Sequence, residues 1–174
     1  IDPDEKSTQS FMLRFENWCE DYSRVGFNLS ITGMGYSISE HFSLPVQASV
    51  LEHFITRVDD DQDGLSWGDD DGIPEAEETI MLPIIIRNKG RSSAEDVEIT
   101  LTSQDSSVDV LEGMAYVSEI PPGDETSISN FRVFADEDFD KEYLPLRLHI
   151  TDSTGIMMIK DINVTQPEKI STLG

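Results

Sequence analysis

The chain has 174 residues, with 35 acidic against 12 basic side chains and a formal net charge of −23. Phosphate groups repel such a surface, so the composition excludes nucleic acid and anionic membranes as partners, whereas cations and proteins with a basic surface remain possible. Hydrophobic residues make up 37% of the chain, enough for the core of one domain or of two small ones. The sequence shows no run of about 18 apolar residues and no signal-peptide pattern, so no membrane insertion is expected.

The first predicted elements are two strands near the N-terminus. Apolar and polar residues alternate over residues 25–31 and again over residues 42–46, which is the two-residue period of a half-buried strand. Gly33-Met34-Gly35 lies between them and favours a hairpin turn. A phosphate-binding role for this short glycine motif is excluded because no helix follows to supply backbone amides.

An acidic segment follows, and its spacing matches an EF-hand-type calcium loop. With Asp59 at position 1, carboxylates fall at positions 3 and 5 (Asp61 and Asp63), a glycine falls at position 6, and Asp70 falls at position 12. Leu65, at position 7, would offer its backbone carbonyl. Oxygen ligands in this order are what Ca²⁺ prefers, so we predict Ca²⁺ binding by these five residues, although Asp at position 12 is shorter than the usual bidentate Glu.

Two other interpretations of this segment stay open at this stage. Asp69 and Asp71 are alternative ligands, because they flank the closing position. The whole stretch could instead be a solvated linker, since runs of like charge repel one another and stay extended.

Short alternating runs continue to the C-terminal end and predict an all-β chain. Tight-turn sequences punctuate them at residues 88–90, 121–124 and 152–155, and strands at this spacing are typical of a β-sandwich. Pro83 falls inside one run, where it cannot donate to a ladder, so we expect an edge position, a bulge or a kink there.

An internal repeat relates the two ends of the chain. Residues 11–47 align with residues 131–166 at an offset of about 120, with small gaps. The matched positions are Phe11 with Phe131, Leu13 with Val133, Ile31-Thr32 with Ile150-Thr151, Phe42 with Ile162, and Leu44 with Val164. The repeat predicts that residues 1–47 are the final strands of an upstream unit and that a complete unit follows.

The middle of the chain resembles bacterial Ig-like repeats of the CARDB type. The residues that carry the resemblance are residues 71–80, 84–90, 94–101, 120–123 and 148–152. It implies small sandwiches that recur in tandem in large surface or secreted proteins, with a spacer or interaction role and no catalytic residues. Ala76-Glu77-Glu78 departs from the Gly-Glu that is usual in such repeats, which changes how Glu78 meets the Asp loop.

Catalytic chemistry finds little support in the sequence. His41, His53 and His149 are scattered, no serine lies in a nucleophile-elbow motif, and Cys19 is the single cysteine. We therefore expect a protein that is not an enzyme.

Two further binding interpretations remain alternatives. Trp18 and Trp67 could stack on sugar rings, which would make the chain a carbohydrate-binding module. The acidic segment at residues 136–140 could be a second cation site or a docking strip for a basic protein, and otherwise a solvated loop.

These observations predict four parts: residues 1–47, a partial Ig-like unit; residues 48–72, an acidic linker with the calcium loop; residues 73–166, an Ig-like β-sandwich; and residues 167–174, a tail. The expected function is a structural and interaction module of a bacterial surface or secreted protein, in which Ca²⁺ rigidifies the linker between neighbouring repeat domains. The alternative is a partner-recognition or regulatory domain whose acidic surface binds a basic protein.

Overall fold

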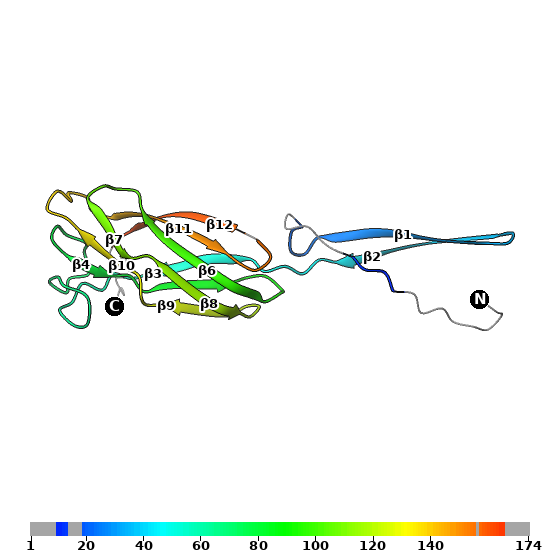
Figure 1. The fold of residues 1–174 in the computed structure, drawn as a ribbon, viewed down its shortest axis with the longest axis horizontal. Coiled ribbons are helices and arrows are strands. Elements are labelled where there is room, and N and C mark those ends of the chain that lie inside the picture. Colours follow the sequence, from blue (N-terminus) through cyan, green and yellow to red (C-terminus); the bar gives the residue numbers. More distant parts are fainter. Residues whose placement is uncertain (1–9, 14–18, 156, 166–174) are drawn as a thin grey trace, which may run out of the picture.

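The structure is a computed structural model that describes residues 10–13, 19–155 and 157–165, and the described residues form strands and loops without a helix (Figure 1). All strand pairs are antiparallel. The prediction of an all-β chain is confirmed. Two sheets pack face to face as a sandwich, and one hairpin stands outside it.

The first sheet of the sandwich has the strand order β12-β11-β6-β8. Its strands are β6 (Ala94–Ser103), β8 (Met114–Ile120), β11 (Leu144–Thr151) and β12 (Met157–Val164). Every second residue of β11 is buried and the residues between them are half-buried, as the alternation in the sequence predicts.

The opposite layer, which we call the second sheet, consists of two three-stranded sheets with the strand orders β3-β5-β9 and β4-β10-β7. The strands are β3 (Leu51–Thr56), β4 (Thr79–Met81), β5 (Ile84–Asn88), β7 (Val108–Glu112), β9 (Glu125–Ile128) and β10 (Arg132–Ala135). Pro83 separates β4 from β5 and has no N–H to donate, which explains the break predicted there. Backbone hydrogen bonds bridge the break, from Arg57 to the Pro83 carbonyl (3.0 Å) and from Leu82 to the Phe131 carbonyl (2.9 Å).

The inner faces of the two sheets form one continuous hydrophobic core. Phe131, at the entry to β10, is its largest fully buried side chain, and it is surrounded by aliphatic residues of both sheets. Burial of this apolar surface is the main stabilising contribution to the sandwich. The fully buried residues of this core include Ile80, Leu82, Ile84, Ile86, Ile99, Leu144, Leu146 and Leu148.

The remaining strands, β1 (Arg24–Gly33) and β2 (Tyr36–Pro45), form a hairpin that projects from one end of the sandwich (Figure 1). Gly35 has a φ of 83°, which accounts for the glycine in its tight turn. Arg91 joins the base of the hairpin to the sandwich: its guanidinium donates to the Val46 carbonyl (2.6 Å) and to Asp21 Oδ1 (3.3 Å). It also lies over the ring of Tyr22, 3.8 Å from the centroid.

The part expected to be an acidic linker, residues 48–72, has a different structure. Residues 51–56 are β3, which pairs with β5 inside the sandwich, so the Asp-rich segment is the connection from β3 to β4 within one unit. The link between the hairpin and the sandwich is residues 46–50. The charge run suggested a boundary, but the strand that precedes it pairs with β5 in the sandwich.

Candidate metal site

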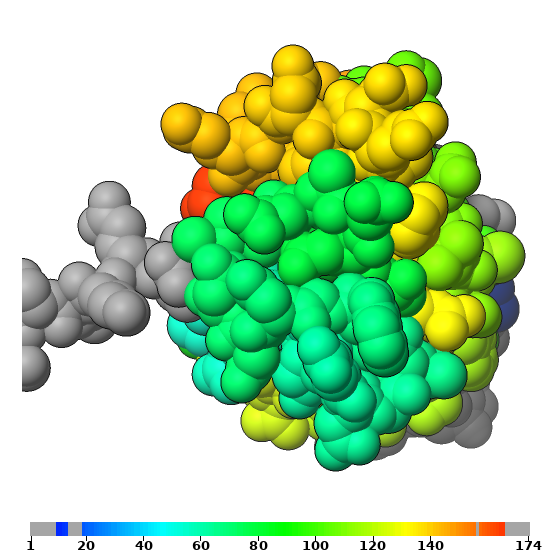
Figure 2. Space-filling model, turned by 90° about the vertical axis from the view of Figure 1, so that its left-hand side faces the viewer, coloured from blue at the N-terminus to red at the C-terminus, as the bar shows by residue number. Residues whose placement is uncertain are grey.

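The connection from β3 to β4, residues 57–78, lies at the end of the sandwich opposite the hairpin (Figure 1). Figure 2 looks onto this end: the loop, in teal and green, covers its lower half, and the segment after β10, in orange, covers the upper part. Two isolated bridges tie the loop to β4, one between Asp59 and Met81 and one between Trp67 and Thr79. Its two arms are therefore extended, and side chains next to each other in sequence point to opposite sides.

This alternation separates Asp59 and Asp61 from Asp60. Asp60 is 2% exposed, whereas Asp59 and Asp61 are half-buried. Val58 packs against the core two residues before Asp60, and an extended chain with a period of two turns Asp60 inward as well. The consecutive aspartates therefore contribute to two different acidic clusters.

The first cluster contains four of the five predicted calcium ligands. Asp59, Asp61, Asp63 and Leu65 line a shallow pocket of about 270 Å³ together with Gly64, Ser66 and Met81. We call it the Asp-loop pocket.

Oxygen atoms converge on the Ser66 hydroxyl in this pocket. Ser66 Oγ lies 3.2 Å from Asp59 Oδ1, 2.8 Å from Asp61 Oδ1 and 3.0 Å from the Asp63 carbonyl. A hydroxyl has one proton and can donate it to one of these acceptors at a time. The hydrogen bonds that Asp61 accepts from the Asp63 N–H and the Ser66 hydroxyl lower the pKa of the Asp61 carboxyl.

The fifth predicted ligand, Asp70, is not part of this pocket's lining. Its backbone is in the left-handed region, with a φ of 64°, and its side chain is exposed. The turn at Asp70 directs its neighbour Asp69, one of the two alternative ligands, toward the second cluster instead.

The second cluster consists of Asp60, Asp69 and Glu78, which we call the carboxylate triad. One carboxylate oxygen from each residue lies within 4.8 Å of the others. Asp60 and Glu78 are 2% and 6% exposed, and Asp69 is exposed. The triad could hold a metal ion, and within the described residues it is the one group of acidic, histidine or cysteine side chains that meets this distance.

Backbone amides orient the two buried carboxylates. The Gly72 N–H donates to both Asp60 oxygens (3.2 and 3.1 Å), and the Glu75 N–H donates to Glu78 Oε2 (2.9 Å). Gly68 closes the site from the other side: a Cβ at that position would lie 2.4 Å from the Asp60 carbonyl oxygen and 2.6 Å from Glu78 Oε1. A larger residue would therefore collide with the triad.

The electrostatics of the triad favour a positively charged occupant. Burial raises the pKa of both Asp60 and Glu78, and neighbouring carboxylates raise it further, against the lowering effect of the backbone N–H donors. Within the described part of the chain, no Lys, Arg or His forms an ion pair with a triad residue. Buried carboxylates without a basic partner need a proton or a cation.

The sequence reasoning identified Asp69 and Glu78 as near the site but missed Asp60. The available signal was the period of two that connects Val58, on the core side, with Asp60. The EF-hand spacing emphasised the odd-numbered aspartates, which lie on the other side of the extended segment.

Of the other residues considered for chemistry, those that the structure describes are not members of the triad. Trp67 is 63% exposed, and Trp18 falls outside the described residues. His41 Nδ1 lies 2.7 Å from Asn28 Oδ1 on the hairpin, and His53 Nε2 lies 2.7 Å from Thr56 Oγ1. In the acidic segment at residues 136–140, Asp136 Oδ1 accepts from the Asp138 N–H (2.9 Å), which is a local turn.

Comparison with known proteins does not assign the chain to a family. No protein-family model matches the chain, and no curated protein matches its sequence significantly. The resemblance to CARDB-type repeats therefore stays a prediction. The described residues contain no helix of the length and apolar character needed to cross a membrane.

Proposed function

We propose that this chain is a non-catalytic structural module of a multidomain protein and that Ca²⁺ bound at the carboxylate triad stabilises the β3–β4 loop. The observation that carries the proposal is the convergence of Asp60, Asp69 and Glu78, two of them buried, without a basic partner. The free energy of ion binding adds to the stability of the folded state, because the unfolded chain does not assemble the site.

The ligand chemistry supports Ca²⁺ over other metal ions. The three side chains offer carboxylate oxygens only, which suit hard cations such as Ca²⁺ and Mg²⁺, whereas Zn²⁺ and Cu²⁺ prefer nitrogen or sulfur ligands. Ca²⁺ accepts six to eight oxygens in a flexible arrangement, and backbone carbonyls of an irregular loop can complete such a set. Mg²⁺ requires a near-ideal octahedron, which a long loop provides less readily.

The location of the triad defines what the ion would stabilise. The loop and the C-terminal end of β12 lie at the same end of the sandwich, away from the hairpin (Figure 1). Ca²⁺ bound here would make this end rigid, so the proposed role moves from the linker between two units to one end of a single unit. A site of this kind suits an extracellular surface protein, since extracellular modules bind Ca²⁺ with dissociation constants of about 0.1 to 1 mM.

A calcium titration followed by thermal unfolding tests the proposal. We expect about 10 mM Ca²⁺ to raise the Tm of the wild-type chain by several degrees, since ligand at about 10 to 100 times its Kd adds about 1.4 to 2.7 kcal/mol. The double variant Asp60→Asn/Glu78→Gln should lose this rise, because it removes two of the three carboxylates. Glu98→Gln, an exposed residue of β6, is the matched control and should keep it.

Metal-free samples provide a second, opposite readout. Without Ca²⁺, the double variant should be as stable as wild type or more stable, because neutral amides relieve the repulsion between buried carboxylates while still accepting from the Gly72 and Glu75 N–H groups. A wild-type chain whose Tm does not respond to Ca²⁺ would refute the proposal. It would favour the alternative in which the acidic surface recognises a basic protein.

A third variant locates the ion. Asp61→Asn/Asp63→Asn alters the Asp-loop pocket and leaves the triad unchanged. If the triad binds the ion, this variant keeps most of the calcium response. If the response disappears with this variant and survives in the triad variant, the ion occupies the EF-hand-like set predicted from the sequence.

A further inference from the structure

The β1–β2 hairpin has the same strand register as the β11–β12 hairpin of the sandwich. With an offset of 119 residues between β1 and β11 and of 120 residues between β2 and β12, matched positions of the two hairpins have matched cross-strand partners. Near the open end, Val25–Leu44 corresponds to Leu144–Val164, and near the turn, Ile31–Ile38 corresponds to Ile150–Met158. Two unrelated hairpins would share such a register only by chance.

The two hairpins differ in burial at these matched positions. Ile31 is 57% exposed, whereas Ile150 is 1% exposed. Leu44 is 40% exposed, whereas Val164 is 3% exposed. The apolar face of β11–β12 lies against the second sheet, whereas no sheet among the described residues lies against the equivalent face of β1–β2 (Figure 1).

The residues before the hairpin show the same contrast. Phe11 and Leu13 are 78% and 49% exposed, whereas their matches Phe131 and Val133, at β10, are both 0% exposed. The repeat therefore covers both a β10-type segment and the final hairpin, and both segments lack the surface that buries their equivalents.

The sandwich shows which strands would cover them. β11 pairs with β6 on the edge that does not face β12, and β10 pairs with β4 and β7. All three of these partners precede β10 in the chain, so strands of the same type would precede residue 10. We propose that the β1–β2 hairpin completes a preceding sandwich repeat of the same polypeptide, whose β6-type strand pairs with the free edge of β1.

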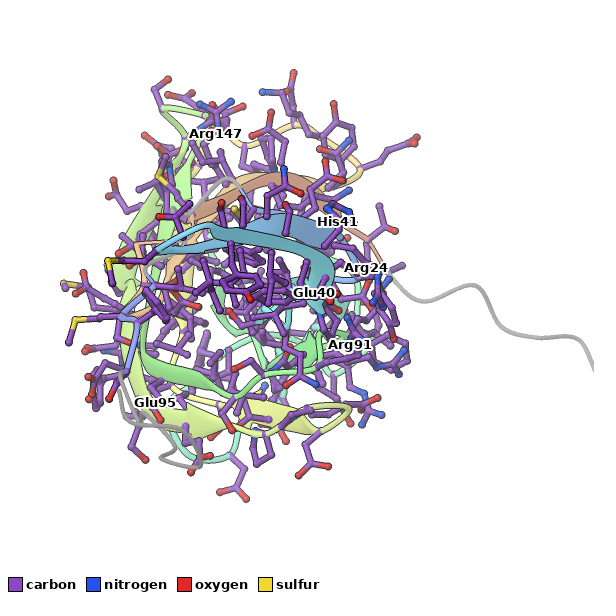
Figure 3. All side chains as sticks on the ribbon, turned by 90° about the vertical axis from the view of Figure 1, so that its right-hand side faces the viewer. Arg24, Glu40, His41, Arg91, Glu95 and Arg147 are labelled. Carbon is purple, nitrogen blue, oxygen red and sulfur yellow. The ribbon has the colours of Figure 1, made fainter. Side chains whose placement is uncertain are left out.

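The charge of the hairpin fits an interior position. Between residues 24 and 45 there is one acidic residue, Glu40, and one basic residue, Arg24, whereas the whole chain carries −23. Figure 3 looks along the hairpin and shows Glu40 and His41 on opposite sides of β2, as strand alternation requires. Glu40 lies on the apolar face, and its match in β12 is Lys160, which is exposed, so a sandwich tolerates a charged residue at this position.

The base of the hairpin then becomes the joint between two repeats. Arg91 contributes to it from the second unit, and Asp21 and Val46 contribute from the first (Figure 3). Asp21 also accepts from the Ala48 N–H (3.0 Å), and its side chain is 4% exposed. These directed contacts tie the base of the hairpin to the second unit.

A fusion protein tests the proposal by supplying the missing strands. A second copy of residues 48–129 is placed directly before Ser10, so that it offers β4-, β6- and β7-type strands to residues 10–45. Amide hydrogen exchange is then followed by mass spectrometry in peptides from β1 and β2. We expect exchange in the hairpin to slow by about 100-fold or more relative to the 174-residue chain, because an isolated two-stranded hairpin is only marginally stable.

Two variants and one positive control make the result specific. Phe27→Asp in the fusion should return the hairpin to rapid exchange, since Phe27 stacks on Phe42 (5.4 Å between centroids) on the apolar face. Asn28→Asp, on the opposite face, should leave exchange slow. In the positive control a copy of residues 48–165 precedes Val46, so the added body keeps its own final hairpin.

The proposal is overturned if the positive control protects its added hairpin while the test fusion leaves β1 and β2 exchanging as in the 174-residue chain. It is also overturned if the 174-residue chain alone forms a dimer in which β1 and β2 are already protected, since a second copy would then cover the hairpin. The experiment is run with Ca²⁺ and with EDTA. Loss of the calcium response changes neither arm, so failure here is distinct from failure of the proposed metal site.

Discussion

The β1–β2 and β11–β12 hairpins have the same alternating pattern and the same register, yet one is exposed and the other lies in the core. Pattern and register follow from local sequence, because side chains alternate along any strand and the turn sets the pairing. Burial does not follow from local sequence, because it requires a second sheet. The comparison therefore separates what a segment specifies alone from what its partner provides.

The largest difference in stability between the two hairpins is expected when an aspartate replaces the matched isoleucines, Ile31 and Ile150. Ile150→Asp would bury a carboxylate without a partner in the core, which costs more than about 4 kcal/mol and unfolds the sandwich. Ile31→Asp would place the same carboxylate on an exposed face, so the stability of the sandwich should change by less than about 0.5 kcal/mol. Chemical denaturation of both variants, followed by tryptophan fluorescence, measures the contrast. Equal destabilisation by the two would mean that the hairpin is part of the same cooperative unit.

A truncation at matched aromatic residues should give the next largest effect. Phe131→Ala removes the largest fully buried side chain of the core and should cost about 3 to 5 kcal/mol. Phe11→Ala removes a side chain that is 78% exposed and should be nearly neutral. The midpoint of urea unfolding reports both values. A loss at Phe11 comparable with that at Phe131 would show that Phe11 is buried in solution, against the contrast drawn here.

The all-β class, the hairpin turn at residues 33–35 and the break at Pro83 could all be predicted, because each depends on a period of two or on the geometry of glycine and proline. The unit boundary was harder to predict. Residues 51–56 form a short strand without strict alternation of apolar and polar residues, and the Asp-rich run that follows resembled a linker. Their pairing with β5 is a long-range contact that no local pattern encodes.

The candidate site also contains one part that local sequence predicts and one part that depends on the fold. Asp59, Asp61, Asp63 and Leu65, which the EF-hand spacing groups together, line one pocket, since a short loop keeps nearby residues close. The carboxylate triad combines Asp60 with Asp69 and Glu78, and Glu78 lies at the start of β4, on the other side of the loop. Its formation depends on the return of the chain across Gly68, which spacing alone does not reveal.

A smaller effect is expected at the joint that attaches the exposed hairpin. Arg91→Ala removes the cation next to the buried Asp21 and the donor to the Val46 carbonyl. Since Arg91 is partly exposed, we expect a loss of about 1 to 2 kcal/mol, confined to the joint, which corresponds to roughly tenfold faster amide exchange at Val46 and Ala48. Arg87→Ala is the matched control, because Arg87 is equally exposed but pairs with Glu125 inside the sandwich. If both variants accelerate exchange at Val46 and Ala48 equally, Arg91 has no special role in the joint.

The smallest predicted effect is a pH dependence that belongs to the sandwich and not to the hairpin. Burial raises the pKa of Asp60 and Glu78, so the metal-free folded state binds protons more strongly than the unfolded chain does. This contribution to stability is fully present below the unfolded pKa values of about 4 and is lost as the pH rises through the raised folded values. Ca²⁺ reverses the sign in the same window, because the ion requires both carboxylates to be deprotonated.

Urea unfolding between about pH 2 and pH 7, with Ca²⁺ or with EDTA, measures both signs when wild type is compared with Asp60→Asn/Glu78→Gln. Asp61→Asn is an internal control, because the pKa of Asp61 is shifted in the opposite direction. Hydrogen bonds lower the pKa of Asp61, so its contribution is present above the unfolded pKa and is lost as the pH falls through the folded value. Amide exchange in β1 and β2, corrected for its intrinsic pH dependence, should not vary with the pH-dependent stability of the sandwich, either with Ca²⁺ or with EDTA. If the wild-type and double-variant curves are parallel under both conditions, the raised pKa values and the metal site are both refuted, because each requires the two carboxylates to titrate differently in the folded state.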